Sequence, residues 1–600
     1  MKLITEEELV SATKLDKFKM PGIASFLMEV MKLNEINEVF SSNMHVEGLD
    51  FIDAILDHIG VKLEINEDEL KNIPREGPFI AVANHPYGGI EGLLLLKVIC
   101  SQRPEFKLMA NFLLSKIPNL KEFFIPVNPF ETVRSVSSIA GMKHAMETIK
   151  SGIPLGVFPA GEVSTYKTSE QRITDKQWSP VIGKLIQKTK ATVLPVYFHG
   201  NNGLLFNVLS LIHPSLRTAR LPSEFLNKKG HTIRIRIGKA LTADDYGTFQ
   251  NSAQILNYLR AKTYALGSGI EVRKQYLKEL FKVNARQEPV VTTLPKEVLV
   301  NEIHTLRPDF LITSEKMYEV YVAPASKIPN ILQEIGRLRE VTFREVGEGT
   351  NKKIDLDQFD LYYNHLFIWD KDESRMVGSY RLGKGKDIFY SYGVNGFYLS
   401  TLFKMRKEFY PVLEEALELG RSFITKDYQT KPLSLFLLWK GILYFLIKNP
   451  SYRYLIGPVS ISNNFSKFSS SLIVDYLIKN HFDRKMAALV TPQKKFRIKS
   501  DKLDTDILLQ QHSSIKSLDN LISDIEIDHN KVPVMLRQYI AINSKLIGFN
   551  VDPKFSNCVD GFLVVDVHEI PEEKIRMLSK ELNQQEEILK KDKTASFVLK

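Results

Sequence analysis

The residues best suited to chemistry in the first half of the chain are a histidine and a glutamate six positions apart, His85 and Glu91. The histidine follows a short apolar run and lies beside Gly88 and Gly89, where a helix is expected to begin. A carboxylate bonded to one ring nitrogen fixes the tautomer and stabilises the imidazolium, so the other nitrogen can take a hydroxyl proton as that oxygen attacks a thioester. The competing interpretation is a helix-capping Asn-His turn without catalytic function. This segment alone favours neither the catalytic nor the capping interpretation.

A second group of polar residues lies in the other half of the chain, around Glu418 and Arg421. Both lie on or just after a strand-like run, with a long apolar helix expected close behind. An arginine and backbone N–H groups at such a place can hold a pyrophosphate or a phosphopantetheine arm. For this pair alone, a structural Glu–Arg pair at a strand end is the better interpretation.

Short apolar runs followed by turn residues predict the strands that position the His85 turn. They alternate with helical stretches, which predicts an α/β sandwich with a largely parallel sheet whose site residues gather at strand ends. The strands are expected at residues 77–83, 154–158, 192–198 and 232–237, with a helix at 90–99. Helical spacing of apolar residues also predicts a helix at 23–40, more consistent with a core-facing helix than with one lying on a membrane.

This pattern is interrupted at Val283–Pro295, where prolines and short polar residues without helical periodicity predict a linker. Strand-like runs then resume, and no internal repeat relates the two halves. The later strands are expected at residues 365–369, 376–382, 417–424 and 455–461, with a long apolar helix at 433–447. We therefore predict two different domains, residues 1–290 and residues 291–600.

The composition is that of a globular protein, with 44% hydrophobic and 25% charged residues among 600. It excludes a disordered, collagen-like or low-complexity chain. The two cysteines, Cys100 and Cys558, lie in different halves, so we expect neither a disulfide framework nor a metal site, and we expect a reducing cytoplasm. The N-terminus lacks the apolar segment of a secretory signal, and the densest apolar stretch is shorter than the about 20 residues that span a bilayer.

Positive charge is concentrated in one region of the sequence. Residues 101–300 contain 28 Lys and Arg against 14 Asp and Glu, whereas residues 1–100 contain 9 against 17. A basic region attracts anionic partners such as nucleic acid, a membrane surface, phospholipid head groups or an acidic carrier protein. The chain has no zinc-finger spacing, RNA-binding aromatic signature or long Lys/Arg tract, which argues against nucleic acid.

Three segments of the first half carry a family resemblance: Asn84-His85 with its glycines, Phe158-Pro159-Ala160-Gly161-Glu162, and Val193-Leu194-Pro195-Val196. In this order and spacing they resemble the glycerophospholipid (PlsC-like, lysophosphatidic acid) acyltransferase family. That family has Asn-His, four spacers and Asp, then Phe-Pro-Glu-Gly-Thr and a Val-Pro-Val strand. Here Ile90 occupies the Asp position with Glu91 after it, and Ala160 replaces the second Glu. Both departures resemble the branch of the family labelled hemolysin.

The resemblance implies roles for residues of the first half. His85 and Glu91 would be catalytic, the longer Glu side chain recovering the reach lost by the shift of register. Arg134 is the nearest basic candidate for the family's substrate-phosphate arginine, which is missing from residues 123–128. The implied substrate-binding residues are Asn84, Gly88, Gly89, Arg134, Phe158, Pro159, Gly161 and Glu162.

Five ordered blocks in the second half, from His365 to Ser460, carry a second resemblance. With a closing region at 533–562 they resemble the ornithine-lipid N-acyltransferase family, relatives of the acyl-homoserine-lactone synthases among the GNAT-like acyltransferases. The match runs from about Glu334 to Val567. It implies transfer of a 3-hydroxyacyl chain to an α-amine, and the implied site residues are His365, Arg381, Glu418, Arg421 and Ser422.

The two halves in this order resemble the bifunctional ornithine-lipid synthases. The implied fold class is α/β, an N-terminal glycerolipid-acyltransferase-type α/β domain followed by a GNAT-like α/β acyltransferase domain. The C-terminal half would N-acylate an amino acid, and the N-terminal half would O-acylate the lyso-lipid to give an ornithine- or glycine-type lipid. We expect no bound cofactor, with acyl-ACP or acyl-CoA as acyl donor. The expected partners are acyl carrier protein, the amino-acid substrate and membrane lipids, with the protein cytoplasmic and peripherally associated with the inner face of the cell membrane.

Three alternatives stay open from the sequence. The first is a lysophospholipid (1-acylglycerol-3-phosphate) acyltransferase with an accessory GNAT-like domain. The second is a membrane-lytic protein, as the branch label suggests, although no repeat or long apolar segment supplies a pore. The third is a non-catalytic lipid-binding scaffold, which the shifted carboxylate at Glu91 keeps open.

Overall fold

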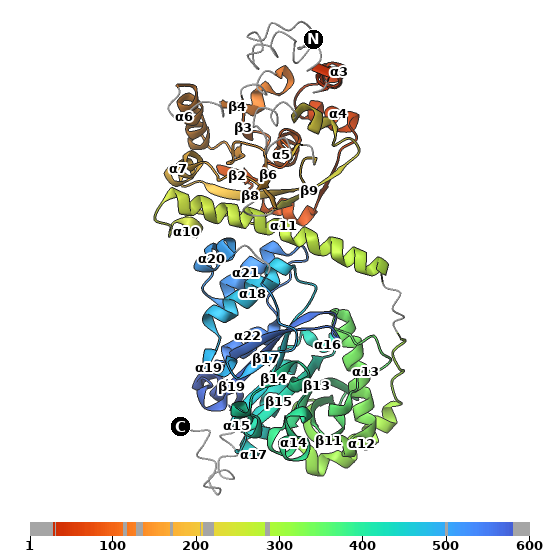
Figure 1. Ribbon diagram of the computed structural model, residues 1–600. Coiled ribbons are helices and arrows are strands. Elements are labelled where there is room, and N and C mark those ends of the chain that lie inside the picture. Colours follow the sequence, from red (N-terminus) through yellow and green to blue (C-terminus); the bar gives the residue numbers. More distant parts are fainter. Residues whose placement is uncertain are drawn as a thin grey trace. The chain divides into compact units, whose positions relative to one another are not determined.

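The computed structural model describes residues 28–29, 32–111, 117–127, 136–167, 172–203, 206–207, 221–282, 288–498 and 502–579 (Figure 1). The chain divides into two compact units. Unit 1 consists of Met1–Glu271 together with Asp501–His512 and Ser523–His529, and unit 2 consists of Val272–Ser500, Ser513–Ile522 and Asn530–Lys600. Two short segments of the C-terminal half therefore belong to unit 1, which the division at residue 290 does not anticipate.

Unit 1 is built on a seven-stranded sheet with the order β1-β9-β8-β2-β5-β3-β4. Every neighbouring pair is parallel except β8 and β9, so the predicted, largely parallel sheet is confirmed. The strands are β1 (Lys62–Ile65), β2 (Phe79–Ala83), β3 (Lys107–Asn111), β4 (Phe124–Val127), β5 (Leu155–Val157), β8 (Thr192–His199) and β9 (Thr232–Ile237). A separate hairpin pairs β6 (Thr165–Lys167) with β7 (Arg172–Thr174).

The centre of unit 1 is the buried pair of β2 and the helix that follows it. All five residues of β2 are buried, and the apolar residues of α5 are buried around its circumference, as a helix inside a layered α/β core requires. The larger helices of the unit are α4 (Gly48–His58), α5 (Ile90–Cys100), α6 (Val136–Lys150), α7 (Pro180–Thr189) and α11 (Ser252–Lys282), which continues into unit 2.

The helix predicted at 23–40 is only partly correct. Within the described residues a helix does run through the second half of this range, as α3 (Leu33–Asn43). It begins after Lys32, whose φ of 55° is left-handed, so an uninterrupted helix across this residue is excluded. Most of the earlier residues of the range lie outside the described part of the chain.

Unit 2 contains an eight-stranded sheet with the order β10-β11-β12-β13-β15-β16-β19-β18. Its pairs are antiparallel except β15 with β16. The strands are β10 (Leu311–Glu315), β11 (Tyr318–Pro324), β12 (Asn364–Asp370), β13 (Arg375–Lys384), β15 (Ala416–Ile424), β16 (Tyr454–Ile461), β18 (Lys545–Asp552) and β19 (Cys558–Asp566). All four strands predicted for this half are present, and the sequence reading did not assign β10, β11, β18 or β19.

Helices pack against this second sheet. The predicted apolar helix at 433–447 is α17 (Pro432–Lys448), which contacts β11, β12 and β13. Its burial within unit 2 explains its apolar composition. The other larger helices are α12 (Lys296–Phe310), α13 (Pro329–Glu345), α18 (Lys467–Asn480), α20 (Lys502–Gln511), α21 (Ile515–Ile525) and α22 (Val534–Ala541), of which α20 and the end of α21 belong to unit 1.

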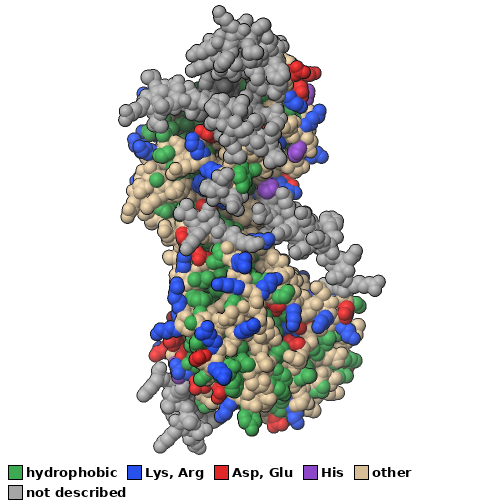
Figure 2. Space-filling model, in the orientation of Figure 1, with side chains coloured by type: hydrophobic (Ala, Val, Ile, Leu, Met, Phe, Trp, Pro, Cys, Tyr) green, Lys and Arg blue, Asp and Glu red, His purple; other side chains and the backbone are tan. Residues whose placement is uncertain are grey.

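The predicted linker is irregular where the structure describes it. Residues 288–295 form no helix or strand, and Glu288 and Val291 donate backbone hydrogen bonds to Asn351 and Lys353. This part of the segment is therefore attached to unit 2. No helix in the described ranges has the length and apolar character needed to cross a membrane. On the face shown in Figure 2, Lys and Arg side chains are spread over both units and interspersed with Asp and Glu.

Candidate active sites

The His85 turn joins the end of β2 to the start of α5. Nδ1 of His85 and Oε1 of Glu91 are 2.8 Å apart, and the Glu91 side chain is fully buried. The expected contact between the two residues is therefore present, and the longer glutamate side chain spans the shifted register. Because Nδ1 is engaged by the carboxylate, Nε2 is the ring nitrogen left for a substrate.

The Glu91 carboxylate also organises the backbone of the turn. It accepts hydrogen bonds from the N–H groups of Tyr87 at 2.8 Å, Gly88 at 2.7 Å and Gly89 at 2.9 Å. Burial alone would raise the pKa of Glu91, but the His85 charge and these hydrogen bonds lower it below its ordinary value, so Glu91 is ionised at neutral pH. Glu91 therefore both holds the backbone at the start of the helix and pairs with His85, so the two interpretations of this segment are compatible.

Gly88 is required by the shape of the turn. Its φ of 100° lies in a region that L side chains rarely adopt. A Cβ atom at this position would also lie 2.6 Å from Leu221 and 2.9 Å from Val163. Any larger residue would therefore displace the N–H groups that hold Glu91.

The ring of Phe158 stacks on one face of the His85 ring. The two ring centroids are 4.5 Å apart with an interplanar angle of 23°. The His85 side chain keeps 18% of its surface exposed. Within the described part of the chain Nε2 has no hydrogen-bond partner. The imidazole is thus oriented by a carboxylate and an aromatic ring with one nitrogen uncommitted, the arrangement expected of a general base.

Asp175 is a further residue of this site that sequence reasoning missed. Its fully buried carboxylate accepts hydrogen bonds from the His85 N–H at 3.1 Å, the Ser164 hydroxyl at 2.6 Å and the Trp178 indole at 2.9 Å. Ser164 N–H in turn donates to the His85 carbonyl at 2.7 Å. Asp175 therefore fixes the backbone of the turn at His85, in addition to the contacts of Glu91. No sequence motif links residues 90 positions apart.

The remaining residues predicted for this site have varied surroundings. Both polar atoms of the Asn84 side chain bond the backbone of Phe198 in β8, at 2.7 and 2.9 Å, so Asn84 pins the turn to the sheet. Pro159 accepts a backbone hydrogen bond from Ser179 at 2.8 Å, and Gly161 has a left-handed φ of 66°. Glu162 forms an ion pair with Lys176 at 2.9 Å. Arg134 lies outside the described residues.

Replacing Glu91 by Gln in the full chain should lower the catalytic rate of unit 1 by more than about tenfold, because a neutral amide cannot stabilise a protonated His85 ring. Complete loss of a general base would lower the rate by about 10²–10⁴. Stability should also fall by about 1–3 kcal/mol, since the amide N–H₂ faces backbone donors. Turnover measured well below the melting temperature separates the two effects. Full turnover in the folded variant would reduce Glu91 to a helix-start carboxylate.

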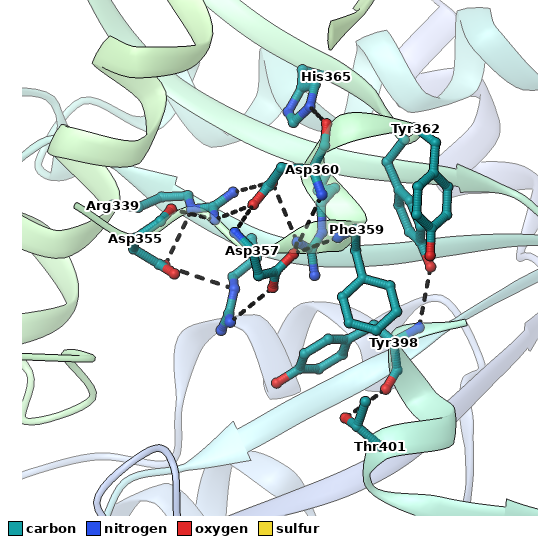
Figure 3. Close-up of polar contacts among 12 residues, drawn as sticks. Arg339, Asp355, Asp357, Phe359, Asp360, Tyr362, His365, Tyr398 and Thr401 are labelled. Carbon is teal, nitrogen blue, oxygen red and sulfur yellow. Dashed lines mark hydrogen bonds and ion pairs between the residues drawn. The ribbon is translucent and has the colours of Figure 1, made fainter. Parts of the chain in front are cut away.

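In unit 2 two of the predicted site residues, Arg381 and Arg421, belong to a largely buried network of three carboxylates and three guanidinium groups (Figure 3). Arg339 bonds Asp360 at 2.8 and 3.0 Å and Asp355 at 3.2 Å. Arg381 bonds Asp357 at 2.6 Å and lies 3.3 Å from Asp360. Burial alone would raise the pKa of Asp360, but the charges of Arg339 and Arg381 hold it far below its ordinary range.

Arg421 joins this network from a distorted strand position. Its guanidinium lies 3.4 Å from Asp357 and 3.7 Å from Asp355 and also covers the Phe555 ring. Its φ is 53°, and the register of β13 with β15 shifts at this point, so two residues of β15 oppose one of β13. Such a bulge re-aims a side chain, and it turns Arg421 toward the aspartates.

Glu418, His365 and Ser422 are each held by their own partners. Glu418 accepts hydrogen bonds from the Tyr363 hydroxyl and from the backbone N–H groups of Tyr398 and Leu399, so the predicted direct Glu418–Arg421 pair is absent. His365 Nε2 contacts the Asp360 carbonyl at 2.9 Å, and burial lowers the pKa of His365 to about 4, which keeps it neutral. The Ser422 side chain hydrogen-bonds Tyr380.

Two further acidic residues, Asp560 and Glu348, were not identified from the sequence, and Asp560 interacts electrostatically with Arg421 of this network. Asp560 on β19 accepts a hydrogen bond from the Ser460 hydroxyl at 2.7 Å, and burial raises its pKa to about 6. Burial and the charge of Asp560 raise the pKa of Glu348 to about 7. Both carboxyl groups therefore have pKa values near neutral pH, as groups at functional sites often do.

The raised pKa of Asp560 predicts a pH-dependent stability. The folded protein holds the proton up to about pH 6 and the unfolded chain only up to about pH 4, so the free energy of unfolding from this group falls as pH rises between these values, by roughly 3 kcal/mol. Chemical denaturation of the full chain at several pH values should show this component in the wild type. It should vanish in Asp560→Asn and persist in the exposed control Asp372→Asn. An unchanged slope in Asp560→Asn would contradict the assignment.

Strands β15 and β16 separate beside these residues. Their parallel pairing covers only Ala416–Glu418 against Tyr454–Ile456, whereas β15 continues along β13 and β16 continues along β19. A Cβ at Gly457 would lie 2.2 Å from the Leu419 carbonyl, while a Cβ at Gly420 would meet no atom within 4 Å. The parallel ladder between the two strands thus ends at Glu418 and Ile456, and the space beside Gly420 is open.

Comparison with known families matches a different family model in each half of the chain. Residues 9–272 match the family model described as Acyltransferase, and residues 338–440 match the model described as Acetyltransferase (GNAT) domain. No cluster of histidine, cysteine and acidic residues suited to a metal ion is present among the described residues.

Two kinds of curated relative each match about half of the chain. A glycine N(alpha)-acyltransferase from Phocaeicola vulgatus is 26% identical over 50% of this chain and 96% of its own length. A lyso-glycine lipid O-acyltransferase from Bacteroides thetaiotaomicron is 27% identical over 42% of this chain and 93% of its own.

Two solved structures were also matched. The 1-acyl-sn-glycerophosphate acyltransferase PlsC from Thermotoga maritima covers 45% of this chain and 88% of its own at 17% identity and a TM-score of 0.24. The CoA-dependent acyl-homoserine lactone synthase MesI covers 44% and 93% at 11% identity and a TM-score of 0.22. From the two family matches, the chain is an acyltransferase that joins an N-terminal acyltransferase domain to a C-terminal GNAT domain.

Proposed function

We propose that this chain makes a membrane aminolipid in two consecutive steps. Unit 2 transfers a 3-hydroxyacyl chain to the α-amine of an amino acid, and unit 1 then acylates the 3-hydroxyl of the resulting lyso-lipid. The observation that carries the proposal is the presence in one chain of similarity to two complementary enzymes, one named for glycine N-acylation and one for lyso-glycine lipid O-acylation. These names favour glycine as the amine, with ornithine as the next candidate.

The geometry of the His85 turn supports a base-assisted O-acylation. In the proposed step, Nε2 of His85 takes the proton of the lyso-lipid hydroxyl as the oxygen attacks the carbonyl carbon of an acyl thioester. The carbon–sulfur bond then breaks, and the departing thiolate receives the proton from the imidazolium. Glu91 holds Nδ1 throughout and stabilises the positive ring, for which its depressed pKa suits it.

For N-acylation the separated strands of unit 2 are the proposed place for the donor's phosphopantetheine arm. Beyond Glu418 the backbone of β15 no longer pairs with β16, so a backbone edge there could bond the amides of this arm, and the thioester would lie near the charged network. In the proposed step the amine nitrogen attacks the carbonyl carbon of the thioester and the carbon–sulfur bond breaks. The proton that the amine loses is taken by the Asp560 and Glu348 pair and passes to the departing thiolate. Glu418 is less suited, because its carboxylate is already occupied by three donors.

We propose acyl carrier protein as the donor's source, because it is acidic and this chain carries a net charge of +10. Acyl-CoA would present the same phosphopantetheine arm, so the two donors differ in protein contacts alone.

The test supplies purified full-length protein with 3-hydroxyacyl carrier protein or 3-hydroxyacyl-CoA and with glycine, ornithine or serine, and identifies the products by mass. N-acylated glycine followed by its O-acylated form supports the proposal. Acylation of 1-acylglycerol-3-phosphate without any acylated amino acid would instead make unit 1 a lysophospholipid acyltransferase. Equal rates with both donors would contradict the preference for carrier protein.

A lipid-handling role also predicts salt-sensitive binding to membranes. Each Lys or Arg near an anionic surface contributes about 1 kcal/mol, and this attraction is screened by salt. In flotation assays the full chain should bind vesicles with anionic lipid and be released by high salt, and neutral vesicles serve as the control. Binding that persists in high salt and needs detergent for release would point to insertion of apolar residues.

A further inference from the structure

Unit 1 contains residues from the far end of the chain. Helix α20 and the last residues of α21, which follow unit 2 strands in sequence, are part of the same compact unit as the His85 turn. The chain accordingly passes between the two units five times. These segments attach to unit 1 through two buried acidic residues, Asp524 and Asp504.

Asp524 neutralises a buried lysine of helix α11. Its carboxylate lies 2.9 Å from Lys262, with side-chain exposures of 5% and 7%, and also accepts the Lys239 N–H at 3.0 Å. Arg236 of β9 donates to the carbonyl of Ile525 at 3.1 Å. A buried lysine needs an anionic partner, and the one it has comes from the C-terminal half.

Asp504 lies beside two arginines of unit 1. Arg172 of β7 is 3.4 Å away and Arg260 of α11 is 3.9 Å away, and the Asp504 side chain is 9% exposed. Arg260 donates to the Thr174 hydroxyl at 2.8 Å and covers the ring of Tyr264.

The contacts of Asp504 connect, through Thr174, to the residue that holds the backbone of His85. Thr174 immediately precedes Asp175, whose backbone N–H donates to the Tyr264 hydroxyl at 2.8 Å. The Asp175 carboxylate accepts the His85 N–H. A continuous series of packed polar groups therefore runs from Asp504 to the turn that carries His85.

We infer that the C-terminal half completes the O-acyltransferase site, with Asp504 as a positioning residue for the His85 turn and Asp524 as the anchor of the docked segment. The functional part of this inference rests on the proposed O-acylation, whereas the structural part does not. It follows that residues 1–290 alone lack part of unit 1, so the O-acylating unit depends on synthesis of the whole chain.

A contiguous series of contacts becomes coupling only when a change at one end alters the other. The test is Asp504→Asn in the full-length protein, which keeps the size of the side chain and removes the charge between the two arginines. Asp528→Asn, an exposed carboxylate of the same docked region, is the matched control.

Asp504→Asn should lower kcat for O-acylation by about tenfold with KM changed less than about twofold, because small misplacements of a catalytic group cost rate. N-acylation by the same molecules should be unchanged. Hydrogen exchange of the His85 amide should become faster, whereas Asp528→Asn should change none of these quantities. Combining Asp504→Asn with Asp175→Asn should cost little more than Asp175→Asn alone, as expected for residues acting in series.

Unchanged O-acylation and unchanged His85 exchange in Asp504→Asn would overturn the inference, as would equal loss of both activities. The exchange measurement needs no substrate, so it decides the structural claim even if the proposed reaction is wrong. For the anchor, Asp524→Asn should lower the melting temperature of unit 1. The paired apolar variant Lys262→Met with Asp524→Leu should recover much of that loss, and a further loss in the pair would contradict the anchoring role.

Discussion

His85→Ala in the full-length protein should reduce O-acylation of the lyso-lipid by about 10²–10⁴ while N-acylation continues at its normal rate. The physical reason is that a lipid hydroxyl stays protonated at neutral pH, and Nε2 of His85 is the oriented, uncommitted nitrogen at the end of β2. The measurement is the rate of each step with purified protein and both substrates. The N-acylation proposed for unit 2 of the same molecule controls for the amount of protein, and the melting temperature of the variant reports whether unit 1 is folded.

The matched control for this experiment is His144→Ala, which removes an exposed histidine of α6 in the same unit. It should leave both steps unchanged. O-acylation at the wild-type rate in His85→Ala would exclude His85 as the base, and equal loss in the two variants would point to a general effect on unit 1.

Arg339→Leu should destabilise unit 2 by about 3–5 kcal/mol, because it leaves two buried carboxylates without their principal cation. Arg339 and Asp360 are each 1% exposed, and Arg339 makes two hydrogen bonds to Asp360 and one to Asp355. Loss of N-acylation should follow the loss of structure. Denaturant unfolding of the full chain measures the effect as a shift of the unit 2 transition, followed by the fluorescence of Trp369 and Trp439 in unit 2 with Trp178 in unit 1 as the reference signal.

Arg484→Leu serves as the control, since Arg484 is an exposed arginine on the short helix α19 (Arg484–Ala487) of the same unit. A surface change of this kind should alter stability by no more than about 0.5 kcal/mol. If Arg339→Leu were equally mild, the network of Figure 3 would contribute little to folding and its charges would have to be explained by ligand binding instead.

Part of this account follows from the sequence because it depends on local patterns. The buried runs before His85 and around Glu418 predicted β2 and β15. The separation of six residues between His85 and Glu91 made their contact one of two interpretations from the sequence, since a strand end, a glycine turn and a first helical turn bring such residues together, and the structure contains that contact.

The rest depends on contacts between residues far apart in sequence. Asp175 reaches His85 across 90 positions, and Asp560 acts on the pKa of Glu348 across more than 200. Neither pair has a fixed spacing that a sequence pattern can reveal.

The exchange of segments between the units was hidden for the same reason. Helices α20 and α21 lie in the second half of the sequence and were not predicted, and nothing in their sequence marks Asp524 as the partner of Lys262. Likewise, the expected Glu418–Arg421 pair was plausible from spacing, but the bulge at Arg421 turns the arginine toward Asp357.

The central claim is that one chain carries out N-acylation and then O-acylation, and the most direct test is lipid mass spectrometry of a host that lacks such lipids. Cells expressing the wild type should accumulate a diacylated amino-acid lipid, and cells expressing His85→Ala should accumulate the monoacylated lyso-lipid with the same amino acid and 3-hydroxyacyl chain. Absence of any acylated amino acid in the wild type, or diacylated lipid at wild-type levels in His85→Ala, would contradict the account.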